Sequence, residues 1–260
     1  MGELASEVAL LTKDEAERLS GEFEVASAQD VIAWTIERWG GSVAVCSSFQ
    51  AAGMAILDIA HRVDPRVRVF TLDTGRLHQE TYDTIEKVRE RYGIVVEVLH
   101  PDASALEAMV TRWGPNLFYD STEARKLCCQ VRKVEPLARG LGDTGAWFTG
   151  LKRDDSAERA NVPKIAIDSK HGGIAKIAPL ADWSEAQLWD YVRGNDVPIH
   201  PLYGQGYASI GCQPCSRPTE PGEDSRAGRW WWEDAVKECG LHWASPADGS
   251  MESELRDLIG

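Results

Sequence analysis

The sequence predicts an α/β protein whose doubly wound, mainly parallel sheet carries helices on both faces. Short apolar runs typical of buried strands alternate with longer segments that have helical periodicity. Polar loops follow the runs at 42–46 and 67–72, and ligands of such sheets bind beyond the carboxyl ends of the strands. Both loops are therefore expected to face one crevice.

The individual elements are predicted from helix caps and apolar runs. Thr12 opens a capping-box pattern and Ser27 caps a second helix, which together predict an N-terminal helical layer over 1–40. The predicted strands cover 42–46, 67–72, 95–99 and 146–149. The later predicted helices cover 51–61, a segment ending near Tyr92, a segment after 99, 122–139 and 183–195.

The last third of the chain has a different residue composition from the alternating strands and helices before it. Proline, glycine and polar residues are dense over 198–221, which predicts irregular chain at the end of the main α/β domain, 41–225. Three tryptophans from Trp230 onward lead into a short helix predicted to end near Glu238, and such aromatics usually supply core area. The tail after Pro246 is small, polar and acidic, so we expect it to be mobile unless docked.

Composition excludes several classes of protein. The 260 residues are 43% hydrophobic, include ten tryptophans and carry a formal net charge of −13, which predicts a sizeable core and argues against a nucleic-acid partner. No apolar stretch of about 18 residues predicts a membrane span, and Glu3 and Glu7 stand where a signal peptide would be basic. We therefore expect a cytosolic protein, in which six cysteines are more plausibly metal-binding or catalytic than disulfide-bonded.

The loop Ser47-Ser48-Phe49-Gln50 joins a predicted strand to the start of a helix. Backbone N–H groups and the positive end of the helix dipole suit phosphate or sulfate at such a place. The loop matches neither the Gly-x-x-x-x-Gly-Lys-Ser/Thr nor the Gly-x-Gly-x-x-Gly pattern. Two serines that cap an ordinary helix would give the same sequence, so the loop alone leaves both interpretations open.

The tandem pair Cys128-Cys129 and the later Cys212-Gln213-Pro214-Cys215 suggest a metal site. Disulfide geometry opposes pairing between adjacent cysteines, so the pair is expected to have another partner. Basic neighbours such as Arg132 and Lys133 favour thiolates, which select zinc or iron–sulfur clusters. Structural zinc more often has two Cys-x-x-Cys knuckles, and the alternative is two buried thiols with an unrelated surface Cys-x-x-Cys.

Two further cysteines differ in context. Cys239 stands beside Gly240 and three residues before His242, which predicts an accessible thiol that a nearby cation would activate. A structural cysteine at the end of a helix would show the same pattern. Cys46 lies inside a predicted buried strand, so we assign it to core packing.

Together these residues resemble the assimilatory sulfonucleotide reductases, in particular the cluster-containing class typified by adenylyl-sulfate (APS) reductase. The resemblance runs from the strand before Ser47 to His242. The segments that carry it occur in the family order: Leu72-Asp73-Thr74-Gly75-Arg76, Cys128-Cys129 with Arg132-Lys133-Val134-Glu135-Pro136-Leu137, Gly150-Leu151-Lys152-Arg153, Gly211-Cys212-Gln213-Pro214-Cys215, and Glu238-Cys239-Gly240-Leu241-His242.

The resemblance implies the adenine-nucleotide α-hydrolase-like fold shared with the PP-loop-related ATP pyrophosphatases, with nucleotide binding and a cysteine-ligated iron–sulfur cluster in the domain 41–225. We expect the C-terminal segment 226–260, which carries Cys239, to be mobile and to cover the crevice only part of the time. It implies reduction of adenosine 5′-phosphosulfate (APS) to sulfite and AMP by thioredoxin in assimilatory sulfate reduction. Cys239 would attack the sulfate sulfur and become an S-sulfonate, from which thioredoxin releases sulfite. The implied ligands of one [4Fe-4S] cluster are Cys128, Cys129, Cys212 and Cys215.

The resemblance also implies a set of substrate-binding residues. The modified phosphate loop corresponds to Ser47, Ser48, Phe49 and Gln50, and the base and ribose would meet Leu72, Thr74 and Gly150. Preplaced cations offset the charge of the sulfate and of the departing AMP, which explains clustered basic residues in an acidic protein. The implied cations are Lys133, Arg159, Arg226, Arg229 and His242.

Other functions stay open as alternatives. A reductase of the 3′-phosphorylated nucleotide (PAPS), or of both nucleotides, would need only one extra cation, although PAPS enzymes generally lack the cluster cysteines. An ATP-pyrophosphatase-type adenylylating enzyme would want a Ser-Gly-Gly-x-Asp-Ser loop and would have no use for Cys239. A non-catalytic iron–sulfur protein or a zinc-stabilised binding module would not need Cys239 either. The sequence predicts no oligomeric state.

Overall fold

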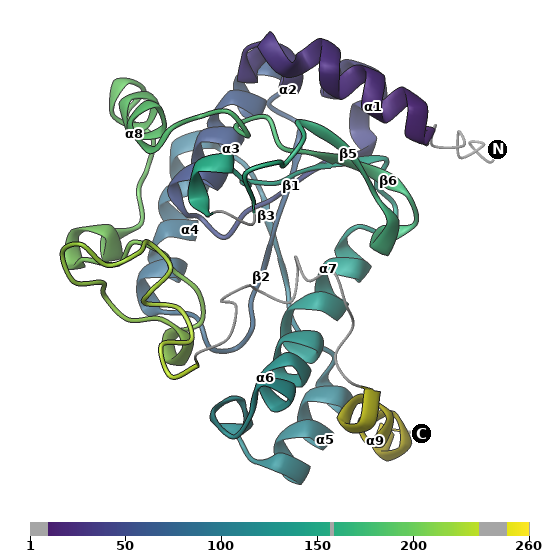
Figure 1. Ribbon diagram of the computed structural model, residues 1–260, viewed down its shortest axis with the longest axis vertical. Helices are drawn as coiled ribbons and strands as arrows, with labels where there is room; N and C mark the ends of the chain where they lie inside the picture. The colour runs from purple at the N-terminus through teal and green to yellow at the C-terminus, as the bar shows by residue number, and fades with distance from the viewer. Residues whose placement is uncertain (1–9, 157–158, 234–248, 260) are drawn as a thin grey trace. The chain divides into compact units, whose positions relative to one another are not determined.

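The computed structural model describes residues 10–156, 159–233 and 249–259 (Figure 1). The chain forms two compact units, each assembled from segments that lie far apart in sequence. Unit 1 comprises 1–71, 83–97 and 141–200, and unit 2 comprises 72–82, 98–140 and 201–260. The predicted domains, which are the N-terminal layer (1–40), the main domain (41–225) and the C-terminal segment (226–260), stay a prediction.

Two capped helices open the described chain, as predicted. Helix α1 (Lys13–Glu22) begins after Thr12, whose hydroxyl accepts a hydrogen bond from the Glu15 N–H (3.2 Å). Helix α2 (Ala28–Trp39) begins after Ser27, which forms a complete capping box with Asp30. These side chains satisfy backbone N–H groups that have no partner inside the helix, so the sequence fixes where each helix starts.

The sheet of the described chain is six-stranded and mainly parallel, with the order β3-β2-β1-β4-β6-β5. Its strands are β1 (Val43–Cys46), β2 (Arg68–Leu72), β3 (Val96–Leu99), β4 (Ala146–Phe148), β5 (Ile165–Asp168) and β6 (Ile174–Ile177). Strand β1 pairs in parallel with β2 and β4, which places Val45 beside Val69 and Phe148. All three side chains are buried, so the centre of the sheet lies in the core of unit 1.

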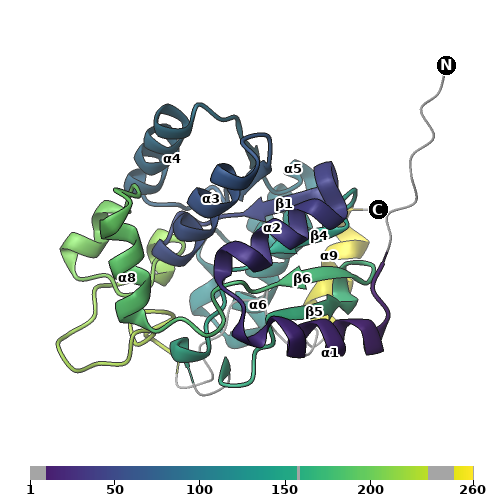
Figure 2. The same cartoon turned by 90° about the horizontal axis from the view of Figure 1, so that it is seen from above.

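The predicted strands at 42–46, 67–72, 95–99 and 146–149 are confirmed, whereas β5 and β6 were not predicted. Strand β5 runs antiparallel to β6 at the edge of the sheet, and α1 lies along it (Figure 2). Each strand has only four residues, and the turn between them needs positive φ angles at Gly172 and Gly173. Such short runs around a glycine turn are hard to distinguish from loop by periodicity alone.

Six further helices agree with the predicted positions: α3 (Ala51–Val63), α4 (Gln79–Tyr92), α5 (Ala103–Trp113), α6 (Thr122–Cys129), α7 (Glu135–Gly140) and α8 (Glu185–Gly194). Helix α9 (Gly249–Ile259), in the tail, was not predicted. The predicted helix over 122–139 is confirmed with one interruption, because Gln130–Val134 forms a π-helix between α6 and α7. Over 198–221 the structure contains short 3-10 turns, at Pro201–Gln205 and Gln213–Cys215, and an isolated β-bridge from Ser216 to Arg229, as the proline and glycine content predicts.

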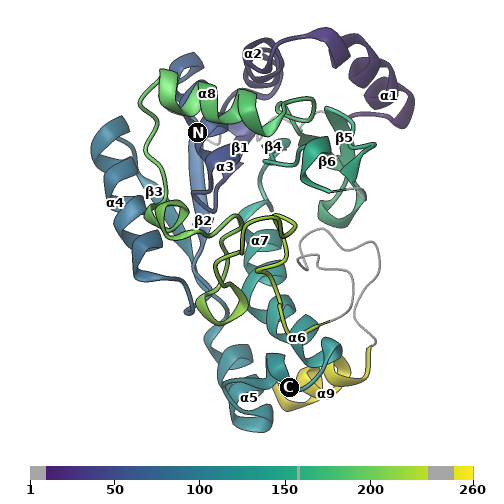
Figure 3. The same ribbon diagram turned by 60° about the vertical axis from the view of Figure 1, so that its left-hand side comes forward.

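Helix α9 docks within unit 2. Figure 3 shows it beside α5 and α6, where Leu255 is buried and the Glu254 carboxylate accepts a hydrogen bond from Arg112 (2.6 Å). The tail is expected to be mobile unless it docks, and α9 docks against α5 and α6. The short helix predicted to end near Glu238 falls mainly on residues outside the described ranges. Among the described helices, none combines the length and the apolarity needed to cross a bilayer.

A fully buried lysine holds the connection between α1 and α2. The Lys164 ammonium donates to the carbonyl oxygens of Glu24 (3.1 Å) and Ala26 (2.8 Å). It also lies 2.8 Å from the Asp182 carboxylate, and none of its side chain is exposed. A buried charge is tolerated when it is paired and hydrogen-bonded, so these contacts fix the turn against the start of β5.

We predict that Lys164→Met lowers the free energy of unfolding by about 3 kcal/mol, because two backbone carbonyls and one carboxylate lose a fully buried donor. Urea unfolding followed by circular dichroism measures the loss. The exposed Lys170, in the turn after β5, provides the matched control. Lys170→Met is expected to change stability by less than about 0.5 kcal/mol, and equal effects of the two substitutions would contradict the assignment.

Candidate active site

The predicted phosphate loop lies at the carboxyl end of β1, directly before α3. Ser47 is buried, and its hydroxyl accepts a hydrogen bond from the Phe49 N–H (3.0 Å). Phe49 is fully buried and adopts a left-handed backbone conformation (φ 58°), which is unusual for a bulky residue. Ser48 is exposed, and Gln50 donates to its hydroxyl (3.1 Å). Ser47 and Phe49 therefore shape the loop, and Ser48 and Gln50 present their polar groups at the start of the helix.

Gly150 lies against the same end of α3. A Cβ atom at this position would lie 3.2 Å from the Ala52 Cβ and 3.4 Å from the Gly53 backbone nitrogen. A Cβ at Gly53 would in turn lie 2.9 Å from the Ser47 hydroxyl. The structure thus brings the loop at 47–50 and Gly150 together in unit 1, and a larger side chain at either glycine would push them apart.

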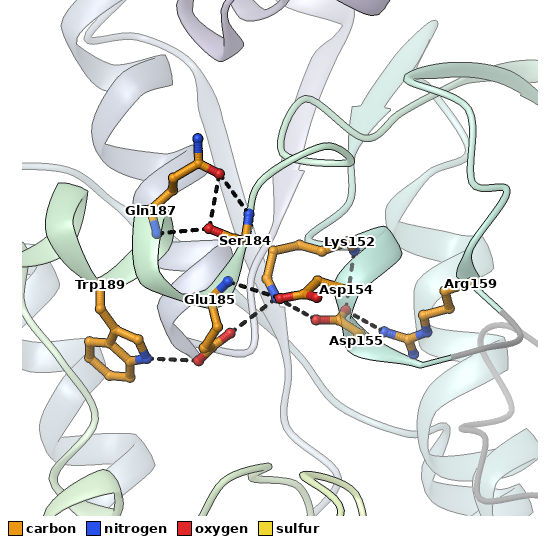
Figure 4. Close-up of polar contacts among 8 residues, drawn as sticks. All are labelled: Lys152, Asp154, Asp155, Arg159, Ser184, Glu185, Gln187 and Trp189. Atoms are coloured by element: carbon orange, nitrogen blue, oxygen red, sulfur yellow. Dashed lines mark hydrogen bonds and ion pairs between the residues drawn. The ribbon is translucent and has the colours of Figure 1, made fainter.

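Arg159, one of the predicted sulfate-binding cations, is also in unit 1. Its guanidinium donates to the Asp155 carboxylate (2.8 Å), and 12% of its side chain is exposed (Figure 4). Asp155 in turn contacts the buried ammonium of Lys152 (2.5 Å). The cation is therefore held in a defined arrangement by its own segment.

In unit 2 the four predicted cluster ligands line one pocket. Cys128 and Cys129 come from the end of α6, and Cys212 and Cys215 come from the 3-10 turn at 213–215 and its start. The other lining residues are Arg76, Phe118, Arg125, Arg132, Lys133, Pro214, Arg229 and Trp230. The fold therefore brings together two pairs of thiols that lie more than eighty residues apart in the sequence, within a ring of arginine and lysine side chains.

The electrostatic environment of these thiols depends on that ring. The pKa of Cys215 is raised to about 12, chiefly by burial and next by the neighbouring Cys212 thiol. Lys133 and Arg229 act against this rise. Burial likewise raises the pKa of Cys128, and Arg132 opposes it most strongly. Buried thiolates without a positive partner are costly, so this site suits thiols that bind a metal centre.

The donor set fits the implied iron–sulfur cluster. Within the described residues, no three histidine, cysteine or acidic side chains converge on one point where a single metal ion could bind. In a [4Fe-4S] cluster the thiolates surround the cluster, each on its own iron, and four cysteines around one pocket provide that arrangement. The cysteines, if they hold the cluster, would do so from two segments, the end of α6 and the turn at 212–215.

Lys133 reaches the cysteine pocket because of the π-helix. On a regular α-helix, residues five apart such as Cys128 and Lys133 need not share a face. The π-helix at Gln130–Val134 closes an i→i+5 hydrogen bond from the Glu135 N–H to the Gln130 carbonyl, which widens the turn. Both Cys128 and Lys133 line the pocket in the structure. The sequence offered no signal for the π-helix.

Thr74 lies beside a cysteine rather than on an open surface. Its side chain is buried, and its hydroxyl is 3.2 Å from the Cys212 sulfur. The Arg132 guanidinium donates to its carbonyl oxygen, and Gly75 follows with a positive φ of 68°. Leu72 is half-buried at the end of β2. Of the two residues expected to meet the base and ribose here, Leu72 is the more accessible one.

Arg229 is tied to the cysteine loop. It is buried, donates to the Cys215 carbonyl oxygen (3.3 Å), and stacks with its guanidinium carbon 4.6 Å from the centre of the Trp230 ring. A Cβ at Gly211 would overlap the Arg229 guanidinium, so a larger residue there would require Arg229 to shift. Arg226 is half-buried, 6.0 Å from the same ring. Trp230 is fully buried, which confirms the packing role expected of it, whereas the same expectation is wrong for Trp231, which is exposed.

Some site residues escaped sequence analysis, and others lie beyond the described chain. Arg76 and Phe118 line the pocket but were not singled out, although Arg76 belongs to the segment that begins at Leu72.

Cys46 is half-buried within β1, and burial raises its pKa to about 12, which supports a packing role. Cys239 and His242 lie outside the described residues, so their roles stay predictions.

Comparison with known proteins places these features in a family. Residues 42–218 match the model of the phosphoadenosine phosphosulfate reductase domain. The chain is 50% identical over 201 residues to adenosine 5′-phosphosulfate reductase of Burkholderia cepacia, covering 77% of this chain and 80% of that protein. It is 48% identical over 202 residues to the enzyme of the same name from Allochromatium vinosum, covering 77% and 78%.

Solved structures confirm the predicted fold. The PAPS reductase of Candida auris in a phosphate complex is 27% identical, with a TM-score of 0.68 over 79% of this chain and 98% of that chain. An FMN adenylyltransferase of Candida glabrata is 16% identical, with a TM-score of 0.52 over 95% of this chain and 92% of that chain, and shares the fold alone. The domain match and the similarity to the bacterial reductases lead to one conclusion: the chain belongs to the PAPS/APS reductase family.

Proposed function

We propose that this protein is an oxidoreductase that reduces APS to sulfite and AMP in sulfate assimilation. The single observation that carries the proposal is the pocket lined by Cys128, Cys129, Cys212 and Cys215 together with Lys133. The similarity to proteins named adenosine 5′-phosphosulfate reductase supports it. We further propose that the enzyme is cytoplasmic, contains one [4Fe-4S] cluster and takes its electrons from thioredoxin.

The proposed reaction has three steps. The Cys239 thiolate attacks the sulfate sulfur of APS, a sulfur–sulfur bond forms, the sulfur–oxygen bond to the phosphate breaks, and AMP leaves. A thiolate of reduced thioredoxin then attacks the Cys239 sulfur and expels sulfite, giving a mixed disulfide. The second thioredoxin thiol resolves that disulfide, so thioredoxin is oxidised by two electrons and Cys239 returns to a thiol.

The residues of unit 1 would bind the anionic end of the nucleotide. The loop at 47–50 offers the N–H groups at the start of α3 and the exposed Ser48 hydroxyl, which suit an oxyanion. Arg159 would offset the charge of the sulfate. Gly150 permits the close approach of its segment to α3 that gives the loop its shape.

The residues of unit 2 would hold the cluster and carry its electrostatic effect. The cluster, when bound, supplies a structural tie between the two cysteine segments and a local charge, and it is not the electron donor. Arg132 lines the cysteine pocket, and its guanidinium donates a hydrogen bond to the Thr74 carbonyl oxygen. Lys133 lines the same pocket as the four cysteines. We propose that Lys133 also contacts the nucleotide, as the family resemblance implies.

The test of this proposal compares APS with PAPS as substrates. Sulfite release is measured under anaerobic conditions with reduced thioredoxin, at equal nucleotide concentrations. We expect kcat/KM for APS to exceed that for PAPS by about 100-fold, the discrimination available when one charged group lacks its partner. Equal values would make the enzyme dual, and sulfite release from neither nucleotide would contradict the proposal. Formation of pyrophosphate from ATP would instead favour an adenylylating enzyme.

A further inference from the structure

A chain of polar contacts in unit 1 connects helix α8 to Arg159 (Figure 4). The side chain of Lys152 is only 3% exposed. Its ammonium group donates to the Glu185 carboxylate (3.1 Å) and to one carboxylate oxygen of Asp155 (2.5 Å). The other oxygen of Asp155 accepts from the Arg159 guanidinium (2.8 Å). The charges alternate in sign along the chain, so each member stabilises the next.

The start of this chain is fixed to a regular element. Glu185 is the first residue of α8, and its carboxylate accepts a hydrogen bond from the Trp189 indole one turn later (2.7 Å). The Glu185 N–H donates to the Asp154 carboxylate (3.0 Å). The Arg153 N–H donates to the Ala181 carbonyl oxygen (2.9 Å). The 3-10 turn that carries Asp155 is thereby attached to the start of the helix and to the segment that precedes it.

Asp155 is itself constrained on more than one side. The oxygen that accepts from Arg159 also accepts from the Lys152 backbone N–H (3.1 Å). Burial alone would lower the pKa of Lys152, but its hydrogen bond to Asp155 and the charges of both carboxylates raise the pKa overall. Lys152 therefore stays protonated and holds the Asp155 carboxylate in one orientation.

We infer that Asp155 is a positioning residue, which orients the Arg159 guanidinium for the anionic end of the sulfonucleotide while Lys152 holds Asp155 in place. An arginine side chain loses considerable rotamer entropy when it is fixed, and its planar fork binds an oxyanion best when it is already oriented. Asp155 restricts that freedom before the nucleotide arrives. The inference rests on the proposed function, because it assigns Arg159 to the sulfate.

The inference predicts coupling between the two residues that depends on the sulfate group. Dissociation constants for APS and for AMP are measured by calorimetry in a Cys239→Ala background, in which APS is not consumed. Asp155→Asn is expected to weaken APS binding by about fivefold to tenfold, within the usual range of coupling between contacting charged groups. Binding of AMP, which lacks the sulfate, should change by less than about twofold. In an Arg159→Gln background, Asp155→Asn should have no further effect on APS.

Asp154→Asn is the matched control, because Asp154 is the adjacent carboxylate and contacts the Glu185 N–H. It should leave the ratio of APS to AMP affinities unchanged. The inference is overturned if Asp155→Asn weakens APS and AMP equally, tightens APS binding, or adds to the effect of Arg159→Gln. The inference is also overturned if the unsubstituted protein binds APS and Arg159→Gln does not weaken that binding. The proposed function would stand in that case. Failure of the unsubstituted protein to bind or reduce APS would overturn the proposed function itself.

Discussion

Cys239→Ser is expected to reduce thioredoxin-dependent sulfite release by at least about 1,000-fold, because a serine hydroxyl is not ionised near neutral pH and cannot replace a thiolate nucleophile. The substitution replaces one sulfur atom with an oxygen atom and should leave the affinity for the nucleotide unchanged. Steady-state sulfite release and the dissociation constant for AMP, measured on the same preparation, separate the two effects. The expected pattern is lost turnover with unchanged AMP affinity.

Cys46→Ser is the matched control for this prediction. Cys46 is half-buried in β1, and burial raises its pKa to about 12, so it is not expected to react at neutral pH. Its serine variant should retain sulfite release close to that of the unsubstituted protein. If Cys239→Ser retained activity and Cys46→Ser lost it, the assignment of the nucleophile would be wrong.

Cys212→Ser is expected to remove most of the iron and acid-labile sulfide from the protein. Cys212 is buried beside the Thr74 hydroxyl, and the segment that carries it has only short 3-10 turns of its own. Metal binding contributes to the free energy of folding when it ties such segments together. We therefore also expect a lower unfolding temperature. Metal analysis and thermal unfolding under anaerobic conditions measure both quantities.

Two results would contradict the cluster assignment. Zinc in place of iron in the unsubstituted protein would point to a structural zinc site. Full retention of iron in Cys212→Ser would show that the metal lies elsewhere. Cys46→Ser serves again as the control, because Cys46 does not line the cysteine pocket and should leave the iron content unchanged.

Much of the fold was predictable because local signals agree with the tertiary structure. Thr12 and Ser27 cap the helices that they were expected to cap, and the apolar run at 43–46 forms the buried centre of the sheet. The pair β5 and β6 was missed because neither four-residue run is long enough to show periodicity. The docking of α9 depends on the surface of α5, and the sequence of the tail does not contain that information.

The site was predictable as a set of residue types and less so as an arrangement. The grouping of the cysteines suggested, and the family resemblance implied, that Cys128 and Cys212 act together, and the structure places them around one pocket. The position of Lys133 depends on a π-helix, which has no recognised sequence signature here. Arg229 was expected at the substrate, yet its guanidinium is hydrogen-bonded to the cysteine loop and stacked on Trp230. Such choices among partners depend on packing, and residue spacing does not determine them.

The most direct test of the account is intact and peptide-level mass spectrometry of the protein after anaerobic incubation with APS, with thioredoxin withheld. The covalent step should then stop at the S-sulfonate, because its acceptor is missing. The account predicts one sulfonate adduct, mapped to Cys239, that disappears with release of sulfite when reduced thioredoxin is added. Protein with an intact cluster that binds APS but forms no adduct on Cys239 would contradict the covalent mechanism.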